Sequence, residues 1–252
     1  AAGPSLDKQL PIIRRERGRL LVIAIGQTLR ALREAGIEPD IVHILESANV
    51  VHQLTGAGDS SNLSLVVTPS VHEGLFAVPV RARFIAWPAP NVVAVWMAEA
   101  LGERGGLIQG AGTVAQSAIY LAARLGATRV LVVGQDLAFS NGRAYASGSA
   151  YGQMGFEVVG NGRFVFTNLR SKADQFGIPV ADGPGPEEEL VWVEGSDGGR
   201  VPTSVPYSTF IEDYRDLAPE MRAMGVEVVN CTEGGALLPG LRHAGFEEAL
   251  RE

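Results

Sequence analysis

One continuous stretch, Gly110 to Ser140, constrains the fold of this 252-residue chain more than any other. A glycine-rich turn, GAGTVA, precedes a segment whose apolar residues recur at the three- and four-residue spacing of a buried helix face. Gly126 follows, and the apolar run Val130–Val133 then leads to Asp136. The pattern predicts a turn, a helix and a buried parallel strand. Because ligands of open α/β sheets collect at the carboxyl ends of strands, Asp136 is the first residue that we expect to contact a substrate.

Five further apolar runs alternate with helical segments along the chain. They cover residues 20–25, 41–45, 65–67, 82–87 and 226–229, and a helix is expected over 28–35. This alternation predicts the α/β class, with a Rossmann-like, mostly parallel sheet and helices on both of its faces. We expect one domain over 1–252.

Residues 141–208 depart from this alternation and are predicted to be an excursion from the sheet. Apolar runs flank Asn161-Gly162 and Asp197-Gly198-Gly199, and such turns between apolar runs indicate β-hairpins. The acidic, proline-rich stretch 182–189 is expected to be a flexible loop. We therefore expect loops and hairpins here, without a separate core.

The composition excludes several classes of protein. Hydrophobic residues make up 46% of the chain and charged residues 19%, so a sizeable core is expected and disorder is not. The net charge of −7 argues against nucleic acid or an anionic membrane as the main partner. No run approaches the roughly 20 apolar residues of a membrane span, and no signal peptide is recognisable. Cys231 is the single cysteine and is expected to be buried packing; these features predict a cytoplasmic protein. Because the chain does not begin with Met, we expect a fragment of a longer protein.

The turn GAGTVA has two interpretations. It matches the dinucleotide fingerprint G-x-G-x-x-A, and Asp136 lies about 20 residues downstream, where an acid would bind a ribose. The lead-in Leu107–Gln109, however, is a poor strand. The less specific interpretation is a turn in which Gly110, Gly112 and Thr113 present backbone amides to an anion at the start of the next helix.

The segment Gly3-Pro4-Ser5 opens the chain and precedes a predicted helix over 7–14. Ser5 is expected either to cap that helix or, together with the amides of the turn, to bind a phosphate. Both interpretations remain open, because a helix start offers the same amides and hydroxyl in either case.

A second polar turn, Thr232-Glu233-Gly234-Gly235, follows the run 226–229. Adjacent glycines let a backbone approach a ligand closely, and we expect Gly112 and Gly234 to tolerate no side chain. An ordinary strand-to-loop turn is the alternative. Glu233 lies near a predicted strand end and is therefore a candidate for contact with a substrate.

Other catalytic patterns are sparse in the sequence. The four histidines have no metal-ligand spacing, and His72 is the best placed of them because it follows a predicted strand end. Tyr145, beyond Asp136, is a plausible contact for a phosphate or hydroxyl. The sequence contains no G-x-S-x-G elbow, no P-loop and no Asp-x-Asp pair.

Five motifs, taken in order, resemble one family. They are GPSL (3–6), GIEPD (36–40), GAGTVAQSAIYLAARLGA (110–127), GQDLAFSNGRAYASG (134–148) and NCTEGGALLPG (230–240). In this order they are similar to the motility-associated-factor (Maf) proteins, whose central domain is related to MptE-like 6-hydroxymethylpterin diphosphokinases. The resemblance covers nearly the whole chain. It implies a sialyltransferase-like variant of the Rossmann fold that transfers a nonulosonic acid, pseudaminic or legionaminic in type, from a CMP-sugar to Ser or Thr of flagellin.

The resemblance also implies roles for individual residues. Asp136, Glu233 and Tyr145 are the candidate catalytic residues, with either carboxylate as base and Tyr145 assisting the leaving phosphate. The candidate nucleotide-binding residues are Gly3, Pro4, Ser5, Gly26, Glu46, Ser70, Gly110, Gly112, Thr113, Thr232 and Gly234. Two positions depart from the family pattern. Glu46 stands where Asp is frequent, and Tyr145 stands where a His is frequent.

Two alternatives remain open. The first is diphosphate transfer from ATP to a pterin alcohol, which needs Mg²⁺; Asp40, Glu46 and Asp136 are its ligands if the fold brings them together. The second is a module that binds a nucleotide-sugar or flagellin without chemistry, which the missing His supports. For sugar transfer we assign no cofactor beyond the CMP-sugar donor and name no metal ligands.

Overall fold

The computed structural model describes residues 1–89, 91–109, 112–169 and 185–252. Its helices are α1 (Leu6–Glu16), α2 (Leu29–Glu34), α3 (His52–Thr55), α4 (Gly74–Ala77), α5 (Val92–Ala100), α6 (Val114–Arg124), α8 (Val205–Glu212), α9 (Tyr214–Ala223) and α10 (Phe246–Ala249). Its strands are β1 (Ile23–Ile25), β2 (Ile41–Ile44), β3 (Ser64–Val67), β4 (Ala82–Ile85), β5 (Trp87–Ala89), β6 (Leu107–Gln109), β7 (Arg129–Val132), β8 (Gly155–Gly160), β9 (Arg163–Thr167), β10 (Glu188–Glu194), β11 (Arg200–Ser204), β12 (Glu227–Asn230) and β13 (Arg242–His243). Within these ranges no helix combines the length and apolarity that a membrane crossing needs.

Parallel strands form the centre of the molecule. Strands β1 to β4 pair in chain order, and β12 pairs with β7 on one side and β13 on the other. Strand β5 follows β4 after Ala86 and pairs with β6. An apolar cavity of about 340 Å³ is lined by residues of both β1 and β7. The carboxyl ends of the strands therefore supply the ligand-binding edge that an open α/β fold offers.

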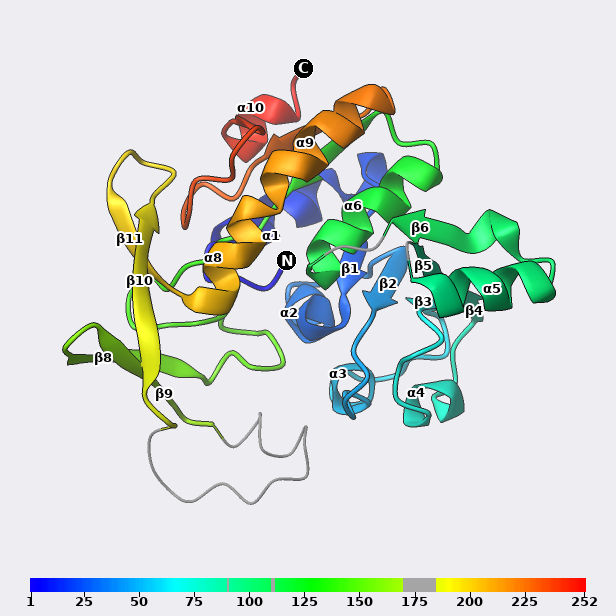
Figure 1. Cartoon of the computed structure of the whole chain (residues 1–252), viewed down its shortest axis with the longest axis horizontal. Helices are drawn as coiled ribbons and strands as arrows, with labels where there is room; N and C mark the ends of the chain where they lie inside the picture. Colours follow the sequence, from blue (N-terminus) through cyan, green and yellow to red (C-terminus); the bar gives the residue numbers. More distant parts are fainter. Residues whose placement is uncertain (90, 110–111, 170–184) are drawn as a thin grey trace.

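Helices cover both faces of the β7–β12 pair, as the α/β prediction requires. Val130, Val132 and Val228 pack in one core cluster with residues of α6 and α9. The alternate residues Leu131 and Val229 pack in a second cluster with residues of α1 and α10. Successive strand side chains point to opposite faces, so this division buries both faces of the sheet. Figure 1 shows α6 and α9 together in front of the strands.

Most predicted elements are present, with shifted ends. The helix after GAGTVA is α6, and the runs 41–45, 65–67, 130–133 and 226–229 are β2, β3, β7 and β12. Strand β1 is shorter than the predicted 20–25, because the Val22 amide donates to the Asp40 carboxylate (2.7 Å) instead of joining a ladder. The run 82–87 is divided between β4 and β5.

The excursion folds into the antiparallel sheet β11-β10-β9-β8, on the left of Figure 1. Asn161 and Gly162 both have positive φ (50° and 67°), as a two-residue hairpin turn requires. The expectation of no separate core is wrong, because an aromatic cluster that includes Phe139, Phe164 and Phe166 packs under this sheet. The expected loop 182–189 is also corrected in part: β10 begins at Glu188, and 182–184 lie outside the described residues.

Candidate functional site

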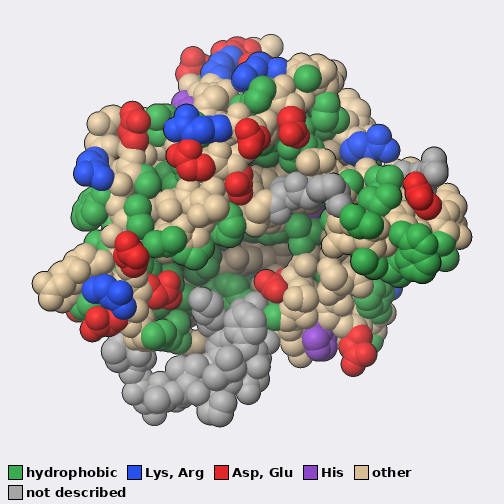
Figure 2. Space-filling view, in the orientation of Figure 1, with side chains coloured by type: hydrophobic (Ala, Val, Ile, Leu, Met, Phe, Trp, Pro, Cys, Tyr) green, Lys and Arg blue, Asp and Glu red, His purple; other side chains and the backbone are tan. Residues whose placement is uncertain are grey.

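A cleft opens at the carboxyl ends of β1, β2 and β3. Figure 2 shows a hollow at the centre of the molecule, between the part that carries β10 and β11 and the part that carries β3 and β4. Its outer part has a volume of about 580 Å³, and an inner part of about 140 Å³ adjoins it through shared lining residues. The outer part brings together six of the predicted residues, namely Gly26, Glu46, Ser70, Gly112, Thr113 and Tyr145. Gly3, Thr113, Asp136 and Tyr145 line the inner part.

Among the described residues the cleft lining combines polar and apolar groups and contains no Lys or Arg side chain. Its carboxylates are Glu46, which is exposed and accepts a hydrogen bond from the Ala48 amide (3.2 Å), and the buried Asp136. Ser70 shares a hydrogen bond with Thr68 (3.1 Å) at the end of β3. Hydroxyls and amides therefore supply most of the polar contacts that a ligand finds here.

Helix α6 begins at the cleft with a complete capping box. The Thr113 hydroxyl accepts from the Gln116 amide (3.2 Å), and the Gln116 side chain accepts from the Thr113 amide (2.9 Å). The same Gln116 side chain donates to the Phe210 carbonyl (2.9 Å), which fixes α8 beside the helix start. Val114 and Ala115 line the inner cleft with the first turn of the helix, whose positive dipole end favours an anion. Gly110 lies outside the described residues.

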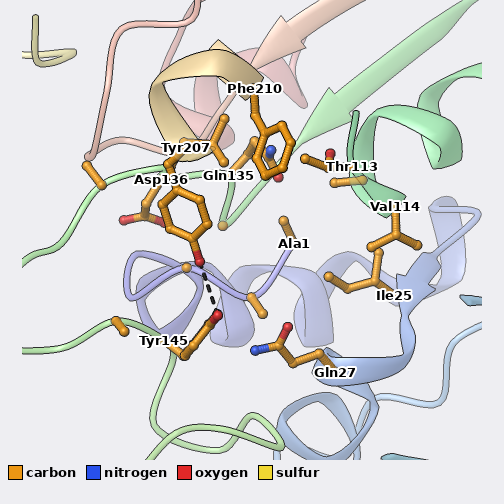
Figure 3. A pocket seen from close by; sticks show the side chains of 17 residues that line it. Ala1, Ile25, Gln27, Thr113, Val114, Gln135, Asp136, Tyr145, Tyr207 and Phe210 are labelled. Atoms are coloured by element: carbon orange, nitrogen blue, oxygen red, sulfur yellow. Dashed lines mark hydrogen bonds between the residues drawn. The ribbon is translucent and has the colours of Figure 1, made fainter. Parts of the chain in front are cut away.

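Tyrosines close the cleft on the side opposite the strands. The Tyr207 hydroxyl donates to the Tyr145 hydroxyl (3.1 Å), and Gln53 donates to the Tyr151 hydroxyl (3.3 Å). Figure 3 shows Tyr145 and Tyr207 linked across the inner cleft, with Gln27 nearby. Burial raises the pKa of Tyr145 and raises that of Tyr207 further, so both hydroxyls remain protonated near neutral pH. Because Tyr207 donates its single proton to Tyr145, the Tyr145 hydroxyl is the one that is able to donate a hydrogen bond to an anionic ligand.

Asp136 lies two residues beyond Gly134 at the end of the β7 segment, but its side chain is only 2% exposed. The side chain is thus almost completely covered, although it contributes to the lining of the inner cleft. Its carboxylate accepts from the Ser5 hydroxyl (2.6 Å) and from the Ser5 amide (3.2 and 3.3 Å). Burial raises the pKa of the Asp136 carboxyl, although the Ser5 hydrogen bonds act in the opposite direction.

The same contacts revise the expectation for the turn at 3–5. Ser5 occupies the N-cap position of α1, as expected, but its side chain makes no capping hydrogen bond because it binds Asp136. The amide and hydroxyl proposed for a phosphate thus hold a carboxylate in this structure. Gly3 is required for the approach, since a Cβ there would overlap the Asp136 carboxylate.

A second, polar pocket of about 560 Å³ lies on the other side of Asp136. We call it the polar pocket; its lining includes Pro4, Ser5, Lys8, Asp136, Asn141, Arg143, Asp197, Asn230, Glu233, Gly234, Gly235 and His243. Five predicted residues, Pro4, Ser5, Asp136, Glu233 and Gly234, meet here and not at the outer cleft. The structure therefore divides the predicted site into two places joined at Asp136.

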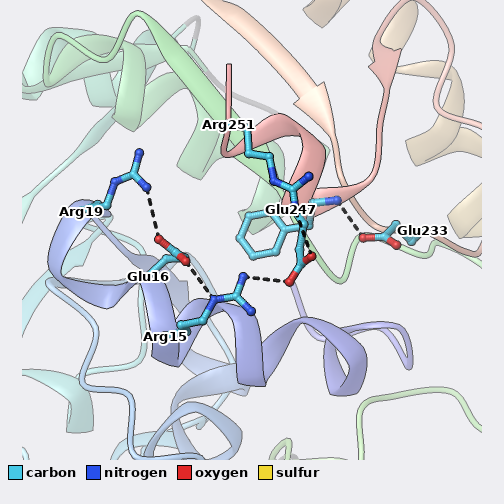
Figure 4. A network of polar contacts seen from close by, with 7 residues as sticks. Arg15, Glu16, Arg19, Glu233, Glu247 and Arg251 are labelled. Carbon is cyan, nitrogen blue, oxygen red and sulfur yellow. Dashed lines mark hydrogen bonds and ion pairs between the residues drawn. The ribbon is translucent and has the colours of Figure 1, made fainter.

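Glu233 is placed differently from its expected role as a base. Its carboxylate accepts from the Phe246 amide (2.8 Å) at the start of α10, as Figure 4 shows, and its carbonyl accepts from Lys8 (3.2 Å). Nearby in Figure 4, Arg15 bridges Glu16 and Glu247. Because these contacts tie α10 to α1 and to the 233 turn, they account for the position of Glu233 structurally.

The other residues of the 232–235 turn are also specified by packing. Thr232 is fully buried, and its hydroxyl accepts from the Gln135 amide (3.1 Å). Gly235 has a φ of 68°, and a Cβ there would overlap the Asp136 backbone, whereas at Gly234 the nearest atoms would lie 3.7 Å away or more. The expected steric requirement thus belongs to Gly235, and Gly234 is free of it. At Gly112, a Cβ would meet the Asp213 carboxylate and the Phe210 ring (3.1 Å).

Several cleft residues were not predicted from the sequence, among them Gln27, Tyr207 and His43. His43 is completely buried in β2 and lines the outer cleft, while the favoured His72 accepts from the Gly74 amide (3.1 Å) away from it. Burial lowers the pKa of His43 to about 4. The sequence signal that could have indicated His43 was the presence of a histidine within an apolar predicted strand. Cys231 is fully buried, as predicted, and burial raises the pKa of its thiol to about 12.

Two other hypotheses meet structural obstacles. The first is the Mg²⁺ site of diphosphate transfer. Asp40 forms an ion pair with Arg17 (2.7 Å). Among the described residues, none of Asp40, Glu46 and Asp136 belongs to a group of side chains that could hold a metal ion. The fold therefore does not assemble the three expected Mg²⁺ ligands.

The second hypothesis is a dinucleotide site at GAGTVA. Strand β6 does precede this turn, contrary to expectation, but β6 pairs with β5, whereas β7 pairs with β12. The adjacent strands of a dinucleotide βαβ unit are thus absent from the described pairings.

Comparisons with known proteins agree with this architecture. The family model "6-hydroxymethylpterin diphosphokinase MptE-like" matches residues 1–142, more than half of the chain. The chain therefore belongs to the MptE-like family, and the family resemblance of the motifs is confirmed. No curated protein matches the chain.

A solved structure of similar fold is the Maf glycosyltransferase from Magnetospirillum magneticum AMB-1. It aligns with a TM-score of 0.64 and 18% sequence identity, over 97% of this chain and 32% of that one. The predicted α/β, Rossmann-like fold is confirmed by this alignment. The chain spans about a third of the length of the Maf protein.

Proposed function

We propose that the chain is a glycosyltransferase domain that takes a sugar from a CMP-type donor bound in the cleft. The observation that carries the proposal is a lining that offers hydroxyls and amides but, among the described residues, no Lys or Arg. A CMP-sugar carries a single phosphodiester, which helix amides and hydroxyls can bind, whereas a triphosphate needs cations to balance its charge. The start of α6, with Thr113, supplies such a phosphate site.

The transfer assigns one role to each cleft group. The bond between the anomeric carbon and the phosphate oxygen breaks, and its electron pair leaves on CMP. The acceptor hydroxyl oxygen forms the new bond to that carbon and gives its proton to a base. Asp136 is the best base, because it lies at the cleft and burial raises the pKa of its carboxyl, which makes the carboxylate a stronger proton acceptor. Tyr145 donates to the leaving phosphate, and Tyr207 orients it by donating to the Tyr145 hydroxyl.

The finer assignments rest on the motifs quoted above. The family resemblance supports a nonulosonic acid as the sugar and Ser or Thr of flagellin as the acceptor. The Maf glycosyltransferase of similar fold supports the same reaction class. With an oxocarbenium-like transition state, Glu46 at the cleft is the exposed carboxylate available to stabilise positive charge.

Diphosphate transfer is the second candidate, and the description of the matching family model favours it. It requires Mg²⁺ with ATP, and the three carboxylates considered for that metal do not form a cluster among the described residues. Calorimetry separates the candidates when CMP, CDP, NAD and Mg-ATP are titrated into the same protein. We expect CMP or CDP to bind most tightly. Tight binding of Mg-ATP or NAD without binding of cytidine nucleotides would overturn the sugar-transfer proposal.

A hydroxyl deletion distinguishes an enzyme from a binding module. We expect Tyr145→Phe to keep CMP affinity within about threefold and to slow release of CMP from a CMP-sugar by at least tenfold, which is about 1.4 kcal/mol. Tyr120→Phe is the matched control, since the Tyr120 hydroxyl binds Glu220 outside the cleft. Nucleotide binding with no release of CMP in the wild type would support a non-catalytic module instead.

A further inference from the structure

We propose that the polar pocket binds the acceptor, a serine or threonine side chain of a polypeptide, and that Asp136 Oδ1 accepts the hydrogen bond of its hydroxyl. The inference rests on the proposed sugar transfer and adds the place where the second substrate binds. Of the described residues, Asp136 alone lines both the inner cleft and the polar pocket. A donor and an acceptor that occupy these two spaces would therefore both lie beside one carboxylate.

The two carboxylate oxygens of Asp136 have different surroundings. The Ser5 hydroxyl donates to Oδ2 (2.6 Å), and the missing side chain of Gly3 leaves room for this same oxygen. Oδ1 faces Gly234, where an added Cβ would lie 3.9 Å from it. The Ser5 amide donates to Oδ1 at 3.2 Å, and a carboxylate oxygen has two lone pairs, so Oδ1 can accept a further hydrogen bond from the polar-pocket side.

The absence of a side chain at Gly234 keeps this approach open. Its φ does not lie in the left-handed region, and an added Cβ would have Ser5 Cβ at 3.7 Å and Lys8 Nζ at 4.0 Å as neighbours. Neither the backbone nor steric packing therefore requires glycine at this position, in contrast to Gly235. A larger residue at position 234 would instead fill the space in front of Asp136 Oδ1.

The pocket has an exposed charged rim and a buried polar floor. Lys8, Asp197 and Glu233 are exposed at the rim, whereas Asp136 and Asn230 are 2% exposed at the floor. A polypeptide backbone can remain outside the rim while a short hydroxyl side chain reaches the floor. Both signs of charge occur in the lining, and Arg143 already pairs with Asp7 (2.7 Å), so the lining favours a neutral hydroxyl over a phosphate.

Amide chemical shifts of the isotope-labelled protein locate both ligands in one experiment. CMP is added first, and we expect its largest shifts at Thr113, Val114 and Ala115. A short threonine-containing peptide is then added to the CMP-saturated protein, and we expect shifts at Lys8, Gly234 and Gly235. The same peptide with valine in place of threonine should bind at least tenfold more weakly. A peptide response confined to the cleft residues, or equal binding of the valine peptide, would overturn the inference.

A substitution at Gly234 makes the test selective. Gly234→Val should preserve the CMP shifts and weaken the threonine peptide at least tenfold, because the new side chain occupies the space before Oδ1. Gly18→Val is the matched control, as nothing lies within 4 Å of a Cβ at that exposed glycine. Unchanged peptide affinity in folded Gly234→Val refutes the acceptor site alone. If CMP causes no amide shifts in the wild type, the proposed function is refuted instead. If a methyl glycoside competes with the peptide at the same amides, the assignment of the acceptor as a peptide is refuted.

Discussion

Protonation of His43 should couple the stability of the cleft floor to pH. The Nδ1 atom of its ring donates to the Val66 carbonyl (3.1 Å), so in the neutral ring Nε2 accepts from the Ser117 hydroxyl (3.0 Å). The side chain is completely buried between β3 and α6. Burial lowers the pKa of His43 to about 4, against an ordinary value of 6.5, and the Val66 contact opposes that change.

The sign and size of the effect follow from this difference. The unfolded chain takes up the proton near pH 6.5 and the folded chain only near pH 4, so the stabilisation is complete above pH 6.5 and is lost as the pH falls toward 4. At about 1.4 kcal/mol for each pH unit, the change in unfolding free energy is on the order of 3 kcal/mol. That is a large fraction of the stability of an ordinary domain.

Urea denaturation of the wild type and His43→Gln at several pH values between 7.5 and 4 isolates this contribution. Other titrating groups act equally in both proteins, so their effects cancel in the difference between the two unfolding free energies. We expect that difference to fall by on the order of 3 kcal/mol over this range. A difference that stays constant with pH would refute the argument that a neutral imidazole is held in the floor.

Three further predictions concern the residues around Asp136 and the α6 cap. Asp136→Asn should abolish transfer. Because burial raises the pKa of Asp136, the wild type should also lose stability relative to this variant as the pH rises through the folded-state pKa. A difference in unfolding free energy, measured by urea denaturation, that does not change with pH would contradict this. Gly235→Ala should cost at least about 2 kcal/mol of unfolding free energy, whereas Gly234→Ala should cost about 0.5 kcal/mol or less, and equal losses would show that the positive φ of Gly235 is not limiting. Thr113→Ala should cost about 1 kcal/mol through the lost helix cap and should weaken CMP binding, measured by calorimetry; unchanged CMP affinity would place the phosphate elsewhere.

Local patterns predicted much of the fold. The apolar spacing of α6, the glycine after it and the runs of β2, β3, β7 and β12 each follow from short-range sequence rules, and the structure contains them. The hairpin at Asn161-Gly162 also follows from its own residues, since both adopt positive φ. The aromatic core of the excursion did not follow, because Phe139 and Phe164 come together only when β8, β9 and the segment after β7 are packed.

The sequence predicted several residues that line the site, but it did not predict which of them lie together in space. Thr113 and Tyr145 were expected near a nucleotide and do line the cleft. The separation of Glu233 and Gly234 into the polar pocket depends on contacts between segments far apart in the chain, which no local pattern encodes. The burial of Asp136 is of the same kind, because its partner Ser5 lies 131 residues earlier.

The position of α1 has a consequence for synthesis of the chain. Besides the Ser5 contact with Asp136, Gln9 in α1 donates to the carbonyl of Thr232, which is 223 residues later (3.0 Å). At typical translation rates, roughly 10 to 45 s separate the two ends of that contact on the ribosome. During this interval the apolar side chains Leu6 and Ile13, fully covered in the finished fold, lack the later strands that bury them. Among the described helices α1 is the earliest in the sequence, yet contacts with residues made much later secure it, so its apolar face should stay uncovered until then.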